Sequence, residues 1–191
     1  MRHTAVTMTM MIAGAILAGC SKPPTIVVHE FHNASLGRYF RTANAAEAAA
    51  LKSNPASGET DTGKSFLAYP PSGYPKDAVP VCRFYGSPSP GPNSHFYTAD
   101  AAECEQLKRT QQTAPATGKR WNFEEVAFAV RLPTGGDCPA DAPVAVYRAY
   151  NNGFERGKDS NHRFTTEPAV YQEMIAKGWK GEKIVMCTPK G

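Results

Sequence analysis

The chain has 191 residues and a formal charge of +4, from 21 Lys and Arg against 17 Asp and Glu. Its basic residues form no tail or cluster, so the composition gives no indication of nucleic-acid binding. With 16 Gly, 16 Pro, 8 Tyr and 9 Phe, the chain suits short strands and many loops better than a helical bundle.

Residues 1–20 resemble the signal peptide of a bacterial lipoprotein. Arg2 supplies the positive end, and the apolar run over residues 8–17 is too short to span a bilayer comfortably. The run ends in Leu-Ala-Gly-Cys, which resembles a lipobox. The resemblance implies that a diacylglycerol is attached to Cys20, where the acyl chains anchor the chain by burying their methylenes. The alternative is an ordinary signal peptide with a chance cysteine.

The anchor implies a location in the bacterial cell envelope, at the periplasmic face of the outer membrane or at the cell surface. Ser21 follows the cysteine, and by resemblance to lipoprotein sorting rules this favours the outer membrane. Residues 21–25 predict a short, stiff tether. Residues 26–191 then form one domain.

Four further cysteines, Cys82, Cys104, Cys138 and Cys187, predict two disulfides in an oxidising compartment. Three pairings are possible. We favour Cys82–Cys104, which closes one repeat on itself, and Cys138–Cys187, which joins the chain end to the start of the last repeat. The alternative is a zinc site, but no two of these cysteines have metal-hairpin spacing.

Internal repetition is the most informative feature of the domain. Residues 81–86 (VCRFYG) align with residues 146–151 (VYRAYN), and residues 93–98 (NSHFYT) align with residues 160–165 (SNHRFT). A helical start follows each second segment, and a Trp and a closing apolar segment come later. We assign the copies to residues 26–70, 80–130 and 144–187.

The first copy departs from the other two. Glu30 stands where Arg83 stands in the second copy, and Tyr39 stands where His95 stands. It also lacks the Trp that the later copies carry as Trp121 and Trp179. If the copies share a binding site, we therefore do not expect the first copy to have it.

Each copy predicts a strand, a strand, a short helix and a strand. Thr98 and Asp100 offer oxygen acceptors just before a helix, and Thr42, Asn44 and Thr165 repeat this feature. One such unit is too small to bury its own apolar face. We therefore predict a β-rich α+β fold of three ββαβ pseudo-repeats, closed around a pseudo-threefold axis like a β-trefoil, with the strand aromatics, Trp121 and Trp179 in a shared core. An open array is the alternative.

The order Arg-x-Tyr, His-Phe-Tyr-Thr, Ala-Ala-Glu, Trp and a closing strand resembles a bacterial repeat family of unknown function. Members occur on secreted and surface proteins, often fused to hydrolases. The resemblance covers essentially the whole chain after the signal segment. It implies an extracellular accessory or binding module and no established chemistry.

Repeated polar and aromatic positions are the candidates for ligand binding. A pocket of this composition could hold a sugar, since aromatic faces stack on its C–H groups and polar side chains bond its hydroxyls. The alternative is that the histidines are structural, because a residue needed for folding repeats as readily as one needed for binding. The candidates are Arg83, Tyr85, His95, Arg148, Tyr150 and His162.

Residues 58–65 (GETDTGKS), from Gly58 to Ser65, fit the phosphate-loop pattern. Such a loop binds phosphates when a strand enters it and a helix leaves it. Here a helix is predicted before the segment and a strand after it, which is the reverse of what the loop needs. We therefore interpret the match from Gly58 to Ser65 as a chance one and expect no nucleotide site.

Two further sets of residues are also expected to carry no chemistry. His29 and His32 have no third ligand for a metal nearby in the sequence. Glu124 and Glu125 are adjacent on a predicted strand, so they should point to opposite faces and cannot easily cooperate in catalysis.

The sequence therefore predicts a lipid-anchored, non-catalytic binding module with no cofactor, metal or nucleic-acid partner. Its partners would be the membrane, through the anchor, and cell-wall or other glycans. The alternative is a structural or protein-interaction lipoprotein, and an enzyme is the third hypothesis.

Overall fold

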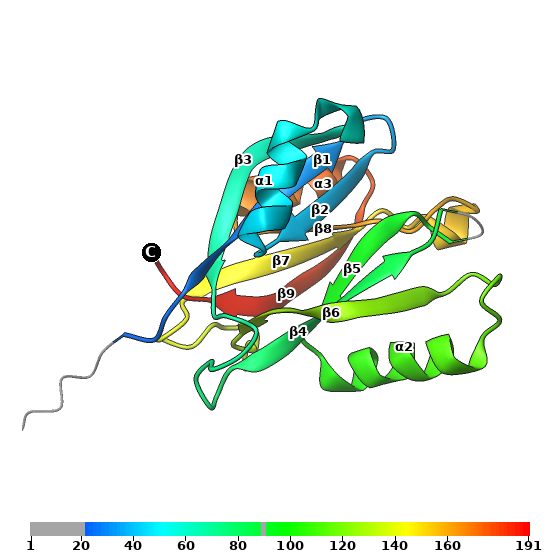
Figure 1. The fold of residues 1–191 in the computed structure, drawn as a ribbon. Helices are drawn as coiled ribbons and strands as arrows, with labels where there is room; N and C mark the ends of the chain where they lie inside the picture. The colour runs from blue at the N-terminus through cyan, green and yellow to red at the C-terminus, as the bar shows by residue number, and fades with distance from the viewer. Residues whose placement is uncertain (1–21, 89–90) are drawn as a thin grey trace, which may run out of the picture.

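The computed structural model describes residues 22–88 and 91–191, which form three separate three-stranded antiparallel sheets (Figure 1). The predicted signal segment, with its lipid-attachment residue Cys20, lies outside these residues, as does Ser21 of the tether. Within the described residues, no helix has both the length and the apolar character needed to cross a membrane.

Each sheet comes from one continuous stretch of chain, and its first strand lies in the centre. The elements of the first sheet are β1 (Ile26–Asn33), β2 (Arg38–Thr42), α1 (Ala45–Ser53), η1 (Pro55–Ser57) and β3 (Glu59–Ala68). Those of the second are β4 (Val79–Gly86), β5 (Ser94–Thr98), α2 (Ala101–Thr113) and β6 (Trp121–Val130). Those of the third are β7 (Val144–Tyr150), η2 (Phe154–Arg156), β8 (His162–Thr165), α3 (Pro168–Ala176) and β9 (Lys180–Thr188).

The helices begin where the sequence places hydrogen-bond acceptors. The side chains of Asn44 and Asp100 each accept two backbone N–H groups in the first turn of α1 and α2. Thr42, Thr98 and Thr165 each accept the backbone N–H two residues later. These bonds satisfy donors that have no partner within the helix, so they fix the point at which the chain leaves the strand and turns.

Residues 58–65, which fit the phosphate-loop pattern, lie at the start of a strand. Gly58, with a φ of 74°, ends the short helix η1, and β3 follows directly. The Asp61 carboxylate accepts the backbone N–H of Gly63 at 2.8 Å, within a bulge of β3. Ser65, the last residue of the pattern, lies within β3 and is paired with the neighbouring strand β1. No helix leaves this segment, so its backbone is not arranged as a phosphate loop.

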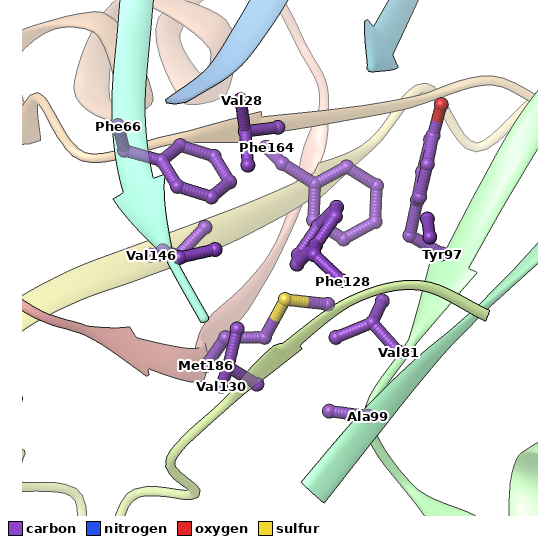
Figure 2. Packing of buried hydrophobic residues seen from close by; sticks show 12 residues of the cluster. Val28, Phe66, Val81, Tyr97, Ala99, Phe128, Val130, Val146, Phe164 and Met186 are labelled. Carbon is purple, nitrogen blue, oxygen red and sulfur yellow. The ribbon is translucent and has the colours of Figure 1, made fainter. Parts of the chain in front are cut away.

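One buried apolar cluster joins the three sheets (Figure 2). Val28 of the first sheet, Phe128 of the second and Val146 of the third are each at most 1% exposed. Complete burial of a side chain of this kind stabilises the fold by roughly 1.5–3 kcal/mol. The other buried members are Phe66, Ala68, Val81, Tyr97, Ala99, Ala127, Val130, Phe164 and Met186.

The predicted β-trefoil-like closure is wrong, because the described residues form no closed barrel. Each sheet is hydrogen-bonded within itself, and the backbone links recorded between sheets are two isolated bridges, Tyr69–Ala129 and Arg131–Cys187. The sheets instead meet through side chains. The sequence pattern specifies each unit, but it does not specify how the edges of neighbouring units meet.

The predicted place of the tryptophans in the shared core is also wrong. Trp121 packs on a separate cluster around the Cys82–Cys104 disulfide, where its ring centroid lies 5.6 Å from that of Phe96. Trp179 is half-buried and makes an edge contact with Tyr39 at 6.4 Å.

Two disulfides brace the fold, and they are the pairings that we favoured from the sequence. Cys82–Cys104 links β4 to α2, and Cys138–Cys187 links the segment before β7 to β9. Disulfides of this kind persist in oxidising compartments, so they fit a location outside the cytoplasm.

Candidate functional site

Arg83 lies at the junction between the first and second sheets. Its Nη1 is 2.9 Å from Glu47 Oε2 on α1, and its Nε is 2.8 Å from Glu124 Oε2 on β6. The guanidinium also lies over the Phe40 ring, 5.3 Å from its centroid. Burial by itself lowers the pKa of Arg83, but the neighbouring anionic groups raise it above its ordinary value, so the charge persists. Arg83 therefore holds two sheets together.

Glu125 also reaches this guanidinium, which the sequence did not predict. Arg83 of β4 pairs with Glu125 of β6, but Phe84 pairs with Phe123, so β6 has one extra residue at this point. This bulge breaks the strict alternation of side chains along β6. Glu125 Oε1 consequently lies 3.1 Å from Arg83 Nη1, close to the Glu124 contact. The expectation that the two adjacent carboxylates are kept apart was wrong, and both are engaged by one arginine.

Arg148 repeats the arrangement at the junction between the second and third sheets. Its Nε lies 2.7 Å from Glu182 Oε2, and its Nη1 lies 3.3 Å from Glu103 Oε2 on α2. Its guanidinium is 5.2 Å from the centroid of the Phe96 ring. The two arginines that the sequence marked as ligand-binding candidates thus have structural partners.

The third junction, between the third and first sheets, uses the opposite charge. Glu30, at the position of Arg83, is fully buried and lies 2.8 Å from Arg41 Nη2 and 2.9 Å from Arg163 Nη2. Arg163 lies over the Tyr39 ring at 4.1 Å. The departures of the first copy are therefore paired substitutions across an interface. Sequence reasoning missed Arg41 and Arg163, and their signal was the unmatched charge of Glu30.

His95 and His162 both lie half-buried between aromatic rings. His95 lies 4.5 Å from the Phe40 ring and 5.0 Å from the Tyr85 ring, measured between centroids. Burial, and then the charge of the neighbouring arginine, lower the pKa of each histidine to about 3. Both imidazoles are consequently neutral near pH 7.

The two histidines differ in their access to solvent. The side chain of His162 is 11% exposed and that of His95 is 23% exposed. The Tyr150 ring stacks on His162 at 4.7 Å, and the Tyr150 hydroxyl accepts the backbone N–H of Phe154 in η2, the short helix of the β7–β8 connection. Tyr150 and His162 are therefore occupied with each other and with this connection.

His95 and Tyr85 line a cavity of about 320 Å³ between the first and second sheets. A volume of this size is at the lower end for small-ligand sites. Its wall is rich in polar groups. The lining residues are Asn33, Leu36, Arg38, Tyr39, Phe40, Ser57, Glu59, Tyr85, Asn93, Ser94, His95 and Glu124.

Asn93 and Arg38 shape one wall of this cavity. Asn93 has a φ of 45°, in the left-handed region that asparagine tolerates better than most residues. Its side-chain oxygen accepts the Tyr85 hydroxyl at 2.9 Å, and its backbone carbonyl accepts Arg38 Nη1. Arg38 Nη2 lies 2.6 Å from Asp159 Oδ2 of the third sheet's hairpin connection.

Glu59 is a wall residue from the segment 58–65, in which the sequence predicted no site. Its Oε1 accepts Asn33 Nδ2 at 3.2 Å, while its Oε2 is buried and has no hydrogen-bond partner within the described residues. Burial raises the pKa of the Glu59 carboxyl. Buried acceptors usually have a hydrogen-bond partner, so this oxygen is an unsatisfied acceptor beside the cavity.

Residues of the hairpin connections line the cavity, so it lies at the end of the described fold away from its first residues and from the C-terminus. In Figure 1 the chain enters and leaves on the left, while the three hairpin connections lie on the right. These connections are bonded to one another, since Ser94 Oγ donates to the Ser160 carbonyl at 2.6 Å and Asn161 Nδ2 donates to the Gly37 carbonyl at 2.8 Å. The site is thus built on braced loops.

Asp100 and Asn161, whose polar side chains could also have bonded a sugar, have other roles. Asp100 caps α2, and Asn161 bonds Gly37 as described above. Of the six repeated candidates, His95 and Tyr85 line the cavity, Arg83 and Arg148 join sheets, and Tyr150 and His162 pack together.

Comparison with known proteins assigns the chain to a family. Residues 11–113, more than half of the 191 residues, match a family model described as a domain of unknown function (DUF5648). No match was found among curated proteins or among solved structures. The match to the family model shows that the chain belongs to the DUF5648 family.

Proposed function

We propose that this chain is a lipid-anchored, non-catalytic module that binds glycans in the bacterial cell envelope. The observation that carries the proposal is the polar cavity of about 320 Å³ between the first two sheets. Its wall combines amide, hydroxyl and carboxyl groups with the rings of Tyr85 and Phe40. Sugars are recognised by this combination of hydrogen-bonding groups and ring surface.

The place of the cavity supports the proposal. A chain attached to lipid through Cys20 would have its N-terminal end at the membrane, and the described residues begin two positions later. The cavity is at the opposite end of the fold, so it would face away from the membrane and be open to cell-wall polymers (Figure 1).

The charged groups at the cavity support binding more than catalysis. Glu124 is engaged by Arg83 at 2.8 Å, which holds the carboxylate in an ion pair. With its pKa at about 3, His95 is a weak base near pH 7, where efficient general bases are usually tuned close to the working pH.

Affinity for glycans tests the binding proposal. We expect the mature domain to bind at least one member of a panel of cell-wall and related oligosaccharides in isothermal titration. Leu36 lines the cavity and is 46% exposed, so the larger side chain of Leu36→Trp would occupy space that the glycan needs and should weaken that binding. The matched control is Leu132→Trp, at a leucine that is 43% exposed and does not line this cavity. Absence of binding across the panel, or equal effects of both variants, would reject the proposal.

Lipid attachment is tested separately. The chain with its N-terminal segment should incorporate a labelled fatty acid in a bacterial host and fractionate with membranes. Cys20→Ser should abolish both results. If the chain with Cys20 intact is exported but carries no labelled fatty acid, the segment is an ordinary signal peptide.

The alternative, a protein-interaction role, is supported by one exposed side chain. Phe154 on η2 is 75% exposed, the largest exposure among the large apolar side chains of the described residues. Exposed aromatics of this kind can serve as anchors at protein interfaces. If Phe154→Ala abolishes capture of a specific envelope protein while no glycan binds, this alternative replaces the glycan proposal.

A further inference from the structure

The charges at the cavity between the first two sheets are unevenly compensated. Arg38 is paired with Asp159 at 2.6 Å, and Glu124 is paired with Arg83 at 2.8 Å. His95 is neutral near pH 7 and adds no charge. Glu59 has no cationic partner within the described residues, so the cavity retains one uncompensated carboxylate.

The neighbours of Glu59 do not supply a counter-ion. Asn33 donates one hydrogen bond to its Oε1, but an amide carries no charge. Lys52, at the end of α1, is the last basic residue before Glu59 in the sequence. Its Nζ lies 2.9 Å from Asp61, so it is already paired with another carboxylate. The buried Oε2 therefore lacks both a donor and a positive charge.

Resting on the proposed glycan-binding function, we infer that this cavity takes a sugar that carries a protonated amino group, with Glu59 as its counter-ion. A sugar hydroxyl could donate to Oε2, but only an ammonium group supplies both the donor and the charge. Tyr85 lies in the same wall and presents aromatic surface, which favours a cation.

Binding of paired oligosaccharides tests this inference. The probes are a glucosamine trimer, whose amines are free, and an N-acetylglucosamine trimer, whose amines are acylated and uncharged. We expect the mature domain to bind the glucosamine trimer at least tenfold more tightly at pH 6. Glu59→Gln, which keeps the shape and removes the charge, should abolish this preference and leave the affinity for the acylated trimer within about twofold.

Two controls separate the charge of Glu59 from other effects. Glu105→Gln removes a carboxylate that is 57% exposed and pairs with Lys108 on α2, away from the cavity, so it should leave the preference unchanged. Thermal unfolding of Glu59→Gln should match that of the unchanged protein, which shows that the variant is folded. Spermidine, an amine without a sugar ring, should bind at least tenfold more weakly than the glucosamine trimer.

The outcomes distinguish this inference from the proposal on which it rests. Equal affinity for the two trimers, or a preference that survives Glu59→Gln, overturns the amino-sugar inference and leaves glycan binding standing. If spermidine binds as tightly as the glucosamine trimer, the cavity recognises an amine without a sugar ring, which also overturns the amino-sugar inference. If neither trimer nor any other glycan binds, the proposed function itself fails.

Discussion

Removal of the charge of Glu30 is the sharpest test of how the sheets are held together. Glu30 is fully buried, and it is the carboxylate shared by Arg41 and Arg163, whose side chains are 4% and 9% exposed. Glu30→Gln preserves the size of the side chain and leaves two buried guanidinium groups facing a neutral amide. Thr62 Oγ1, which now donates to Glu30 Oε1 at 3.0 Å, can still bond the amide oxygen.

The cost follows from the asymmetry of buried ion pairs. Loss of one partner from such a pair destabilises a protein by about 3–5 kcal/mol, because the remaining charge is buried without compensation. The retained bond to Thr62 places Glu30→Gln near the lower end, at about 3 kcal/mol. That is a large fraction of the roughly 5–15 kcal/mol that stabilises a typical domain.

Equilibrium unfolding in urea, with both disulfides intact, measures this loss. For Glu30→Gln, the urea concentration at the midpoint should fall, while the slope of the free energy of unfolding against urea concentration stays constant. Glu105→Gln, at an exposed pair, should change the free energy of unfolding by less than about 0.5 kcal/mol. The double variant Glu30→Gln/Arg163→Met should lose less than the sum of the single variants, since the two residues share one ion pair. A loss below about 1 kcal/mol for Glu30→Gln would refute the role assigned to this junction.

The other predictions concern the disulfide, the histidines and a helix cap. The Cys82→Ser/Cys104→Ser variant should lose about 3 kcal/mol in urea unfolding, from the entropy of the 22-residue loop that the bridge closes; an unchanged midpoint would contradict this. The pKa of both His95 and His162 falls from 6.5 to about 3 on folding, so between these values the unfolded chain binds more protons. Stability should therefore fall as the pH is lowered from 6.5 towards 3, and the difference from the His95→Asn/His162→Asn variant isolates the imidazoles; parallel pH curves would argue against neutral buried histidines. Asp100→Ala should cost about 1 kcal/mol by removing the cap of α2, whereas Asp100→Asn should cost much less, as followed by thermal unfolding. Equal losses in the two Asp100 variants would show that the side-chain oxygen is not the cause.

The sequence by itself determined the local features of this protein. The β-rich character follows from its composition, and the start of α2 follows from Thr98 and Asp100, because a helix cap depends on atoms within a few residues. The pairing of Cys82 with Cys104 could be preferred because both lie within one short segment of chain.

The candidate site was only partly accessible from the sequence. His95 and Tyr85 were selected because they recur, and they do line the cavity. The same argument selected Arg148 and His162, which are held in contacts within the fold, since repetition marks structural and ligand-binding residues alike. Glu59 does not recur among the copies, and the phosphate-loop match that contains it was interpreted as a chance one.

Only the tertiary structure decided how the three sheets meet and where a cavity opens between them. Glu30 contacts Arg163, 133 residues away, and the bulge in β6 brings Glu125 to Arg83 against the alternation of the strand. Contacts of this kind depend on the packing of complete units against one another. They leave no local pattern, because the two residues of each pair lie far apart in the chain.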